Sequence, residues 1–324
     1  MGRGHRRTDR RLADAGDHPR GDGGGRRSRR GETAALGAWA VGGRSPSPVR
    51  SVTPAEAPPE LAVAGWRITL LEGDALYAPL RWVLPHAGES ESAWLPCHVL
   101  ICRRDDVTLL VDCGLGVFDD AFEDIPTRAT ELRDLLAAAG CAPDEITAVA
   151  LTHFDPDHSG GVVSGSYPDA LEPTFPKANV FVLDAALELA EGRGEARAEH
   201  AEKLVSALRR HGVEVTGLAN GAQIREGARL LAAPGHRAGH ACLELTGRGE
   251  RFVFLADALH AREHVEHPEW DSLNDSDPDV ALATRRELIA DLAGTGTVVA
   301  CSHVGSFGRV ERSAGGTAVW IDLP

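Results

Sequence analysis

The sequence predicts a layered α/β fold, in which helices cover the faces of stacked β-sheets. Short apolar segments typical of buried strands, such as Val107–Val111 and Asn179–Leu183, alternate with longer segments of helical periodicity. Histidine and aspartate residues follow several of these strands directly, and open α/β sheets bind ligands beyond the carboxyl ends of their strands. We therefore expect one functional site at an edge of the sheets.

The first 60 residues differ in composition from the rest of the chain. Residues 1–50 contain 12 arginines, no lysine and 5 acidic residues, a balance of +7, so the formal net charge of −14 leaves −21 on residues 51–324. Such a segment buries too little apolar surface to offset its ordering entropy. We expect a disordered Arg/Gly-rich extension over residues 1–60 and one domain over residues 61–324. Because acidic residues interrupt the arginines, we expect no nucleic-acid partner.

The composition of the whole chain, with 43% hydrophobic and 25% charged residues, is typical of a soluble globular protein. No apolar run approaches the roughly 18 residues that span a bilayer, so we expect a cytoplasmic protein without a membrane partner. Six cysteines lie outside any Cys-x-x-Cys pair and are expected in the core. Cys301 is the one we expect near a functional histidine, His303. The oligomeric state stays open, with a homodimer as one option.

The domain is expected to begin with strands. Arg103–Asp106 provides the charged turn of a hairpin. Residues Tyr77–Pro96 predict a long irregular loop, and such loops often cover functional sites. The tryptophans of this loop, Trp82 and Trp94, either line a substrate pocket or pack on the core. The strands predicted in this part are Trp66–Leu71, His98–Cys102 and Val107–Val111.

Helices and strands then alternate to the end of the chain. Leucines recur on one face of Thr127–Ala139 and predict a helix that ends at Gly140. Asp277 and Pro278 supply the N-cap and the first position of a later helix. The other expected elements are a helix at Glu195–Arg210 and strands at Glu145–Leu151, Asn179–Leu183, Ala228–Ala233, Arg251–Leu255, Thr297–Cys301, Arg309–Glu311 and Gly316–Ile321.

One stretch, Leu151–Gly161, concentrates the polar chemistry of the chain. Two imidazoles and two carboxylates fall within the six residues His153–His158, directly after a predicted buried strand. These side chains are nitrogen and oxygen donors suited to a divalent transition ion. Pro156 stiffens the loop, and Gly160 with Gly161 lets the backbone pass close to whatever the loop holds. The sequence therefore predicts a metal site here.

The segment His153-Phe-Asp155-Pro-Asp157-His158-Ser-Gly-Gly resembles the His-x-His-x-Asp-His signature of the metallo-β-lactamase fold hydrolases. The resemblance covers roughly residues 65–324 and implies an α/β (α+β) fold, a four-layer αββα sandwich of two mixed sheets flanked by helices. The other motifs that match in the same order are Leu110-Val-Asp-Cys-Gly114, Pro234-Gly-His-Arg-Ala-Gly-His240, Phe254-Leu-Ala-Asp257 and Cys301-Ser-His303.

The resemblance implies two metal ions and assigns their ligands residue by residue. Asp155 departs from the family pattern, since most members have their second histidine at that place. Asp112 is expected to support the metal loop (Leu151–Gly161) without being a ligand. His240 is expected to hydrogen-bond to His236. The implied ligands are His153, Asp155 and His236 for one ion, Asp157, His158 and His303 for the other, and Asp257 between them.

The same resemblance implies a metal-dependent hydrolase that uses a metal-bound hydroxide to cleave a small-molecule substrate, which is an ester, a lactone or a related compound. Spacings such as Asp257-x-x-His260 and Pro268-Glu-Trp270 look most like the branch of lactonases and organophosphate or aryl-ester hydrolases. Asp157 would accept a proton as the tetrahedral intermediate collapses. His260 would donate to the developing oxyanion, unless it is a solvated loop histidine.

Zinc is the expected metal, with manganese or iron as the alternative because Asp155 replaces a nitrogen ligand by an oxygen ligand. If Asp155, Asp157 and Asp257 are all ionised, the two ions keep one positive charge less than in the histidine version. A less positive site stabilises bound hydroxide less, so we expect a metal-bound water with a higher pKa.

Two other classes of function stay open. The first is an iron-dependent oxidoreductase of the same fold, either a persulfide dioxygenase or a di-iron protein, because di-iron members carry a carboxylate at the place of Asp155. The second is a degenerate, non-catalytic binding domain. Metal analysis separates the three classes, which would hold two zinc-like ions, one or two irons, or no metal.

Removal of residues 1–55 is expected to leave folding and hydrolytic activity intact, because the segment has neither a core-forming composition nor metal ligands. Thermal unfolding and turnover of the full-length and truncated proteins provide the comparison. A soluble truncated protein that has lost its activity would contradict this expectation.

Overall fold

The computed structural model describes residues 58–118, 125–128, 130–193 and 199–323. All of them lie in one compact unit. Nearly all of the expected N-terminal extension falls outside the described residues, and so do the first residues of the expected helix Glu195–Arg210. Among the described helices, none is long and apolar enough to cross a bilayer.

The first of two large sheets has eight strands, in the order β1-β2-β3-β4-β6-β9-β10, with β5 paired to β2. Strands β1 to β4 are antiparallel neighbours, whereas β4, β6, β9 and β10 run parallel. The sheet is therefore mixed. Its strands are β1 (Glu60–Val63), β2 (Trp66–Pro79), β3 (Ser92–Arg104), β4 (Val107–Val111), β5 (Thr127–Arg128), β6 (Ala148–Ala150), β9 (Asn179–Leu183) and β10 (Val215–Leu218).

The second sheet has seven strands in sequence order, from β11 to β17. Only β14 and β15 are parallel neighbours, so this sheet is mixed as well. Its strands are β11 (Gln223–Arg225), β12 (Ala228–Ala232), β13 (Ala241–Gly247), β14 (Glu250–Phe254), β15 (Val298–Cys301), β16 (Val304–Arg312) and β17 (Ala318–Asp322). A separate hairpin consists of β7 (Val163–Ser166) and β8 (Ala170–Pro173).

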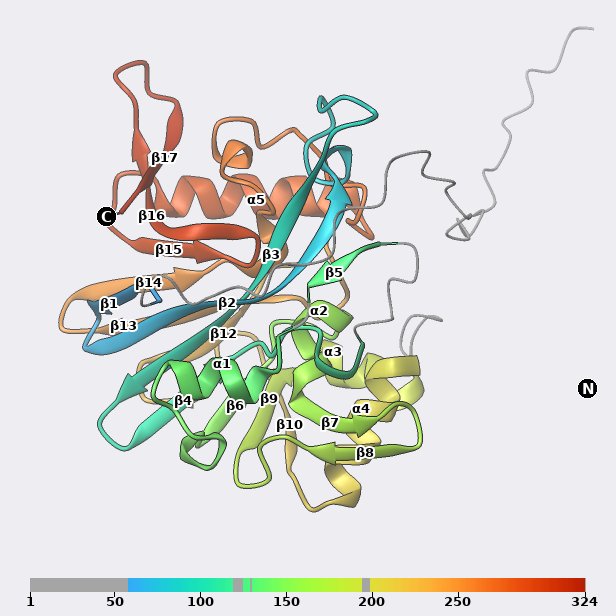
Figure 1. The fold of residues 1–324 in the computed structure, drawn as a ribbon. Coiled ribbons are helices and arrows are strands. Elements are labelled where there is room, and N and C mark those ends of the chain that lie inside the picture. The colour runs from blue at the N-terminus through green and yellow to red at the C-terminus, as the bar shows by residue number, and fades with distance from the viewer. Residues whose placement is uncertain (1–57, 119–124, 129, 194–198, 324) are drawn as a thin grey trace, which may run out of the picture. The chain divides into compact units, whose positions relative to one another are not determined.

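Helices lie on the outer faces of the two sheets (Figure 1). The expected helix Thr127–Ala139 is shorter than predicted, because its first residues form β5. Asp277 caps α5 as predicted, since its side chain accepts a hydrogen bond of 3.1 Å from the backbone N–H of Val280. The helices are α1 (Leu132–Ala138), α2 (Pro156–Ser159), α3 (Asp184–Glu188), α4 (Glu199–Arg210) and α5 (Pro278–Leu292).

Three hydrophobic cores separate four layers. Successive strand residues face opposite sides of a sheet, so Val99 and Ile101 of β3 pack beneath the outer helices while Leu100 packs between the sheets. The third core lies between the second sheet and α5, where Ile289 and Leu292 are buried. The order helix, sheet, sheet, helix is the αββα sandwich that the family resemblance implied.

The predicted motifs come together at one edge of this sandwich. Backbone hydrogen bonds join the two sheets there, from Ala241 N–H to the Thr152 carbonyl (2.9 Å) and from His98 N–H to the Ser302 carbonyl (3.0 Å). Both halves of the fold therefore contribute to the same site. The motif residues that follow strand ends are Asp112 after β4, His153 after β6, His236 after β12, Asp257 after β14 and His303 after β15.

The expectation of a long irregular loop over Tyr77–Pro96 is wrong. Most of these residues extend the hairpin that β2 and β3 form. Strands β2 and β3 stay paired as far as Pro79 opposite Ser92, so the connection is only residues 80–91. Strand β4 pairs with the second half of β3 alone. Among the described residues, no strand of this sheet pairs with that edge of the first half of β3, so the missing N–H of Pro96 can be accommodated there.

Gly160 lies where the metal loop crosses the segment that follows β4. Its backbone angles, φ −60° and ψ −40°, suit any residue. A Cβ at this position would overlap the carbonyl oxygen of Leu115, and one at Gly161 would overlap the carbonyl oxygen of Cys113. The requirement for glycine at Gly160 is thus one of space.

Gly160→Ala is expected to lower the free energy of unfolding by about 1–3 kcal/mol, because overpacking against backbone forces a local shift. Gly305→Ala is the matched control, since a Cβ at Gly305 meets no heavy atom within 4 Å. Urea denaturation of both variants and the wild type measures the difference. Equal stability of the two variants would contradict the spatial argument.

Candidate metal centre

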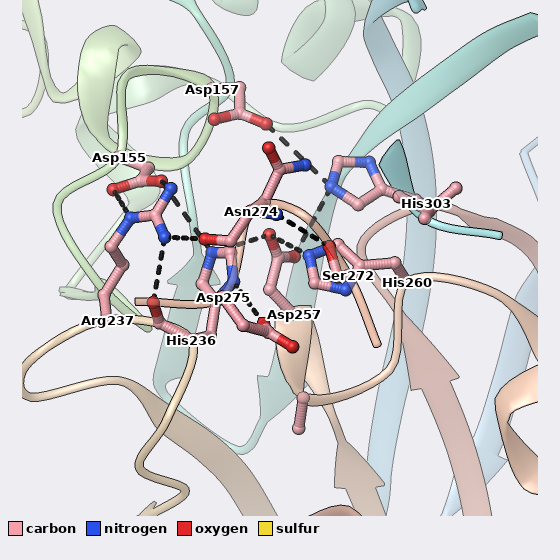
Figure 2. A network of polar contacts seen from close by, with 12 residues as sticks. Asp155, Asp157, His236, Arg237, Asp257, His260, Ser272, Asn274, Asp275 and His303 are labelled. Atoms are coloured by element: carbon pink, nitrogen blue, oxygen red, sulfur yellow. Dashed lines mark hydrogen bonds and ion pairs between the residues drawn. The ribbon is translucent and has the colours of Figure 1, made fainter. Parts of the chain in front are cut away.

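The carboxylate of Asp257 lies at the centre of the candidate site (Figure 2). Its Oδ2 atom lies 3.3 Å from Nε2 of His158 and 3.3 Å from Nε2 of His236. Its Oδ1 atom lies 3.4 Å from Nε2 of His303. Asp257 therefore contacts imidazoles that come from the first sheet and from two different loops of the second sheet.

Carboxylates orient two of these histidines from behind. Nδ1 of His158 donates to Oδ2 of Asp112 over 2.9 Å, and Nδ1 of His236 donates to Oδ1 of Asp275 over 3.1 Å. An ionised carboxylate only accepts, so each Nδ1 carries a proton, and in the neutral ring Nε2 keeps a lone pair that faces the centre. Asp112 thus supports the metal loop from outside the cluster.

The other two histidines are oriented by neutral acceptors. Nδ1 of His303 donates to the carbonyl oxygen of Pro96 over 2.7 Å. The hydroxyl of Thr152 donates its one proton to Asp112 over 2.8 Å. It therefore accepts from Nδ1 of His153 over 3.0 Å. In each of the four rings, Nε2 is left for the interior of the site.

Several inward atoms have no hydrogen-bond partner within the part of the chain that the structure describes. They are Nε2 of His153, Nε2 of His158, Nε2 of His236 and Oδ1 of Asp257, and all four are buried. Leaving one buried polar atom unpaired costs about 1–3 kcal/mol. Divalent transition ions would satisfy these atoms, because such ions accept imidazole nitrogens and carboxylate oxygens as donors. The residues present therefore fit a bound metal.

Burial and neighbouring charges act in opposite directions on the pKa values of this cluster. Burial, with the charge of His158 adding to it, lowers the pKa of His153 well below its usual value. Burial also acts to lower the pKa of His158, but Asp257, Asp157 and Asp112 outweigh it and raise that pKa well above the usual value. Burial acts to raise the pKa of Asp257, but the facing histidines hold it well below the usual range. A cation that binds Nε2 of His158 therefore competes with a proton for this nitrogen.

Asp155 approaches two histidines but is also bound by an arginine. Its Oδ2 atom lies 3.8 Å from Nε2 of His153 and 3.7 Å from Nε2 of His236. Nε and Nη2 of Arg237 contact its two oxygens at 2.9 and 2.7 Å, which makes a bidentate ion pair (Figure 2). Burial acts to raise the pKa of Asp155, but His236, His153 and Arg237 outweigh it and hold that pKa well below its usual range.

Asp157 lies on the other side of the site, with Oδ2 at 3.6 Å from Nε2 of His158 and 3.9 Å from Nε2 of His303. The thiol beside it is Cys97, whose Sγ lies 3.9 Å from the same oxygen. The expectation that Cys301 is the cysteine near the site is wrong. Cys301 ends β15 and packs in the core beneath α5, because the chain turns before His303 and the alternation of the strand does not continue.

His260 points into the site, which overturns its alternative reading as a solvated loop histidine. It is 2% exposed, its Nε2 lies 3.4 Å from Oδ2 of Asp257, and neither ring nitrogen has a hydrogen-bond partner among the described residues. The expected hydrogen bond from His240 to His236 is wrong. Instead, Nδ1 of His240 donates to the Ala233 carbonyl (2.9 Å) and its Nε2 accepts the backbone N–H of Asp257 (3.2 Å). His240 therefore fixes the backbone that carries the central carboxylate.

Two residues with left-handed backbone conformations help to position the carboxylates of Asp112 and Asp257. Asp112 has φ 57° and Ala256 has φ 47°, a region that non-glycine residues rarely adopt. Asp112 stands behind His158, and Ala256 comes directly before Asp257. Such conformations cost on the order of 1–3 kcal/mol each and persist only where the surroundings impose them.

A cavity of about 70 Å³ opens beside the cluster. Trp82 lines it, whereas Trp94 packs against Tyr77 (ring centroids 5.3 Å apart) and beneath the guanidinium of Arg128 (4.0 Å). Trp82 thus lines a cavity at the site, whereas Trp94 is half-buried and lies outside the hydrophobic cores. The apolar lining is Leu76, Ala78, Trp82, Val83 and Leu95, and the polar lining is Asp155, Asp157, Arg237, Asp257, His260, Asn274 and His303.

Three residues of the site were not singled out in the sequence. Arg237 stands directly after His236, so its position within a recognised motif was a usable signal. Cys97 and Asp275 lie in segments without such a motif, and only the fold brings them to the cluster. Asp275 is itself held by Arg285, over 2.9 Å in a pair that is almost fully buried.

Comparison with solved structures gives the same fold. AidC, described as a dizinc quorum-quenching lactonase in complex with a product, superimposes with a TM-score of 0.67 at 21% identity, covering 83% of this chain and 98% of that one. The hydrolase AbOPH gives 0.67 at 21% identity (82% and 97% covered), and a probable metal-dependent hydrolase from Staphylococcus aureus gives 0.66 at 16% (81% and 99%). At these identities the likeness concerns the fold.

Sequence comparison gives the family. Probable metallo-hydrolases of Mycobacterium tuberculosis and Mycobacterium bovis are each 30% identical over 203 residues, or 52% of this chain. The aligned region spans 58% of the length of those relatives. The profile of the Metallo-beta-lactamase superfamily matches residues 93–303, which include all of the converging motifs. This chain therefore belongs to the metallo-beta-lactamase superfamily.

Proposed function

We propose that this protein hydrolyses a small ester, lactone or related substrate with the help of two divalent ions, with zinc as the first choice. The observation that carries the proposal is the set of inward, unpartnered donor atoms around Asp257. The outward nitrogen of each histidine ring is bound by another protein group. This contact fixes the direction of the ring and leaves the inward nitrogen available to a cation.

The proposed ligands form two groups that share one carboxylate. His153, His236 and Asp257 offer donor atoms within 4.8 Å of one another, and so do His158, Asp257 and His303. Asp257 is common to both groups and would therefore contribute to the binding of both ions. Asp155 completes the first group and Asp157 the second, in line with the distances of each to its neighbouring histidines.

The residues of these two groups would hold the ions, which would supply a water of lowered pKa and polarisation of the bond to be cleaved. Two side chains of the chain itself then handle protons and charge. Asp157 lies at the cavity and accepts the proton released when the tetrahedral intermediate collapses. His260 also lines the cavity, and neither of its ring nitrogens has a hydrogen-bond partner among the described residues, so the one that carries the proton is available to donate to a developing oxyanion.

The lining of the cavity supports a small substrate of mixed character. One wall is made of aliphatic side chains and Trp82, and the facing wall carries the donor atoms. An apolar body would pack on the first wall and place a carbonyl against the second. AidC, the structural neighbour described as a lactonase with bound product, agrees with this substrate class.

The substrate class is tested with purified full-length protein whose metal content has been quantified. We expect turnover within a panel of lactones, aryl esters, phosphotriesters and thioesters to be highest for a lactone or an aryl ester. One or two irons with no hydrolysis would favour the oxidoreductase alternative. A protein that binds no metal would favour the non-catalytic alternative.

Asp257→Ala and His303→Ala are each expected to lower metal content and hydrolytic activity together, by about tenfold or more, because each removes a proposed ligand. His267→Ala is the matched control, since this imidazole is half exposed and stacks on Trp270 outside the cluster. Mass-spectrometric metal analysis and turnover measure the effect. Wild-type metal content with full activity in either variant would refute the ligand assignment.

Metal retention is expected to fall as the pH falls from neutral to mildly acidic. The pKa of His158 is raised above its usual value by the surrounding carboxylates, and the pKa values of His236 and His303 are raised as well. Protons therefore compete with the cation for these nitrogens, and acid favours the protons. Competition with a chelating dye over this pH range measures the trend, which a pH-independent affinity would contradict.

A further inference from the structure

The ion pair between Asp155 and Arg237 has the geometry of a fixed unit. Two parallel contacts, at 2.9 and 2.7 Å, join the guanidinium edge to both carboxylate oxygens. Only 22% of the Asp155 side chain and 14% of the Arg237 side chain are exposed. A bidentate arginine–carboxylate pair of this kind is directional as well as strong. Asp155 therefore faces the proposed first ion with an arginine already bound to it.

The remaining donors of Arg237 bind a second segment. Its Nη1 donates to the carbonyl oxygen of His236 over 2.8 Å, to the carbonyl oxygen of Asn274 and to the hydroxyl of Ser276 over 3.4 Å. Between the last two lies Asp275, which orients His236 from behind. Because most of its donors are bound by the protein, Arg237 is a fixed charge. It links Asp155 to the segment that carries Asp275, the residue that orients His236.

This arrangement changes the electrostatics expected from the sequence. In the sequence, Asp155, Asp157 and Asp257 appear as three uncompensated carboxylates beside two ions. Arg237 cancels one of them at a distance of less than 3 Å. The pair as a whole is neutral, so the net charge beside the ions equals that of a site with a neutral imidazole at position 155.

We propose that Asp155 and Arg237 act as one neutral unit in place of a single neutral ligand side chain, and that Arg237 is a positioning residue for the first ion. It sets both the charge and the direction of the Asp155 carboxylate. This inference rests on the proposed metal centre, but it does not depend on which substrate the enzyme hydrolyses.

A consequence is that the aspartate cannot be exchanged for histidine by itself. In Asp155→His, Arg237 keeps its positive charge and loses the carboxylate, so an unpaired guanidinium remains beside the cation. In the double variant Asp155→His/Arg237→Gln, that charge is gone. The effect of the histidine on cation affinity must then depend on whether Arg237 is present.

The test is a double-mutant cycle on the full chain, with the wild type, Asp155→His, Arg237→Gln and the double variant. The dissociation constants of Zn²⁺ and Mn²⁺ are measured by competition with a chelating dye, without any substrate. We expect Asp155→His to bind Zn²⁺ about tenfold or more weakly than the double variant does. Binding by Asp155→His that is as tight as in the double variant, or additive effects around the cycle, would overturn the proposal.

A second comparison remains informative if Asp155→His fails to fold. Arg237→Lys keeps the charge and loses the bidentate fork, whereas Arg237→Gln loses the charge. We expect the acidic limb of the pH–rate profile to move upwards in Arg237→Gln, because Asp155 is then uncompensated, and to return towards the wild type in Arg237→Lys. Identical profiles in the two variants would show that Arg237 has a structural role alone and would overturn the proposal.

A matched control separates this effect from a general loss of stability. Arg251→Gln removes an arginine of β14 that binds Glu244 of β13 over 2.7 Å and Asp291 of α5 over 2.6 Å. Its cation affinity is expected to equal that of the wild type. A wild type that binds neither cation would refute the metal centre and this inference together, whereas a wild type that binds metal but gives an additive cycle would refute this inference alone.

Discussion

The hydrogen bonds on the outer side of the four histidines are the constraint on which the site depends. Each Nδ1 atom is held by a group from a different segment, namely Asp112 after β4, Thr152 after β6, Pro96 in β3 and Asp275 before α5. These bonds set the tautomer of each ring and turn Nε2 towards the interior. The buried donor atoms that result have no hydrogen-bond partner among the described residues, which costs free energy. Bound cations would offset this cost.

The packing of the two sheets against each other also sets the geometry of this site. The bonds from Ala241 to Thr152 and from His98 to Ser302 fix the two sheet edges against each other, and each sheet carries part of the cluster. The left-handed conformations at Asp112 and Ala256 lie at the ends of β4 and β14, where they set the direction of the Asp112 and Asp257 carboxylates. Since well-packed cores deform little, the sheets on either side can hold such strained residues in place.

Charge balance is the second requirement of a site so rich in acids. Asp257 is surrounded by imidazoles at 3.3 to 3.4 Å, and Asp155 is paired with Arg237. Buried charges are tolerated where partners compensate them. The same Arg237 reaches the segment that holds Asp275, and Asp275 is in turn bound by the buried Arg285. A chain of charge-assisted contacts thus runs from the metal loop to α5.

The sequence by itself determined the alternation of strands and helices, the layered fold and the residues of the metal loop, because periodicity and local motifs are properties of neighbouring residues. It did not determine the hairpin over Tyr77–Pro96, since cross-strand pairing between β2 and β3 outweighed the local signals of proline and tryptophan. The roles of Cys97, His240 and Asp275 are contacts between residues far apart in the chain. Only the tertiary structure decided these roles and the pairing of Asp155 with Arg237, 82 residues away, because their distances depend on how the two sheets pack.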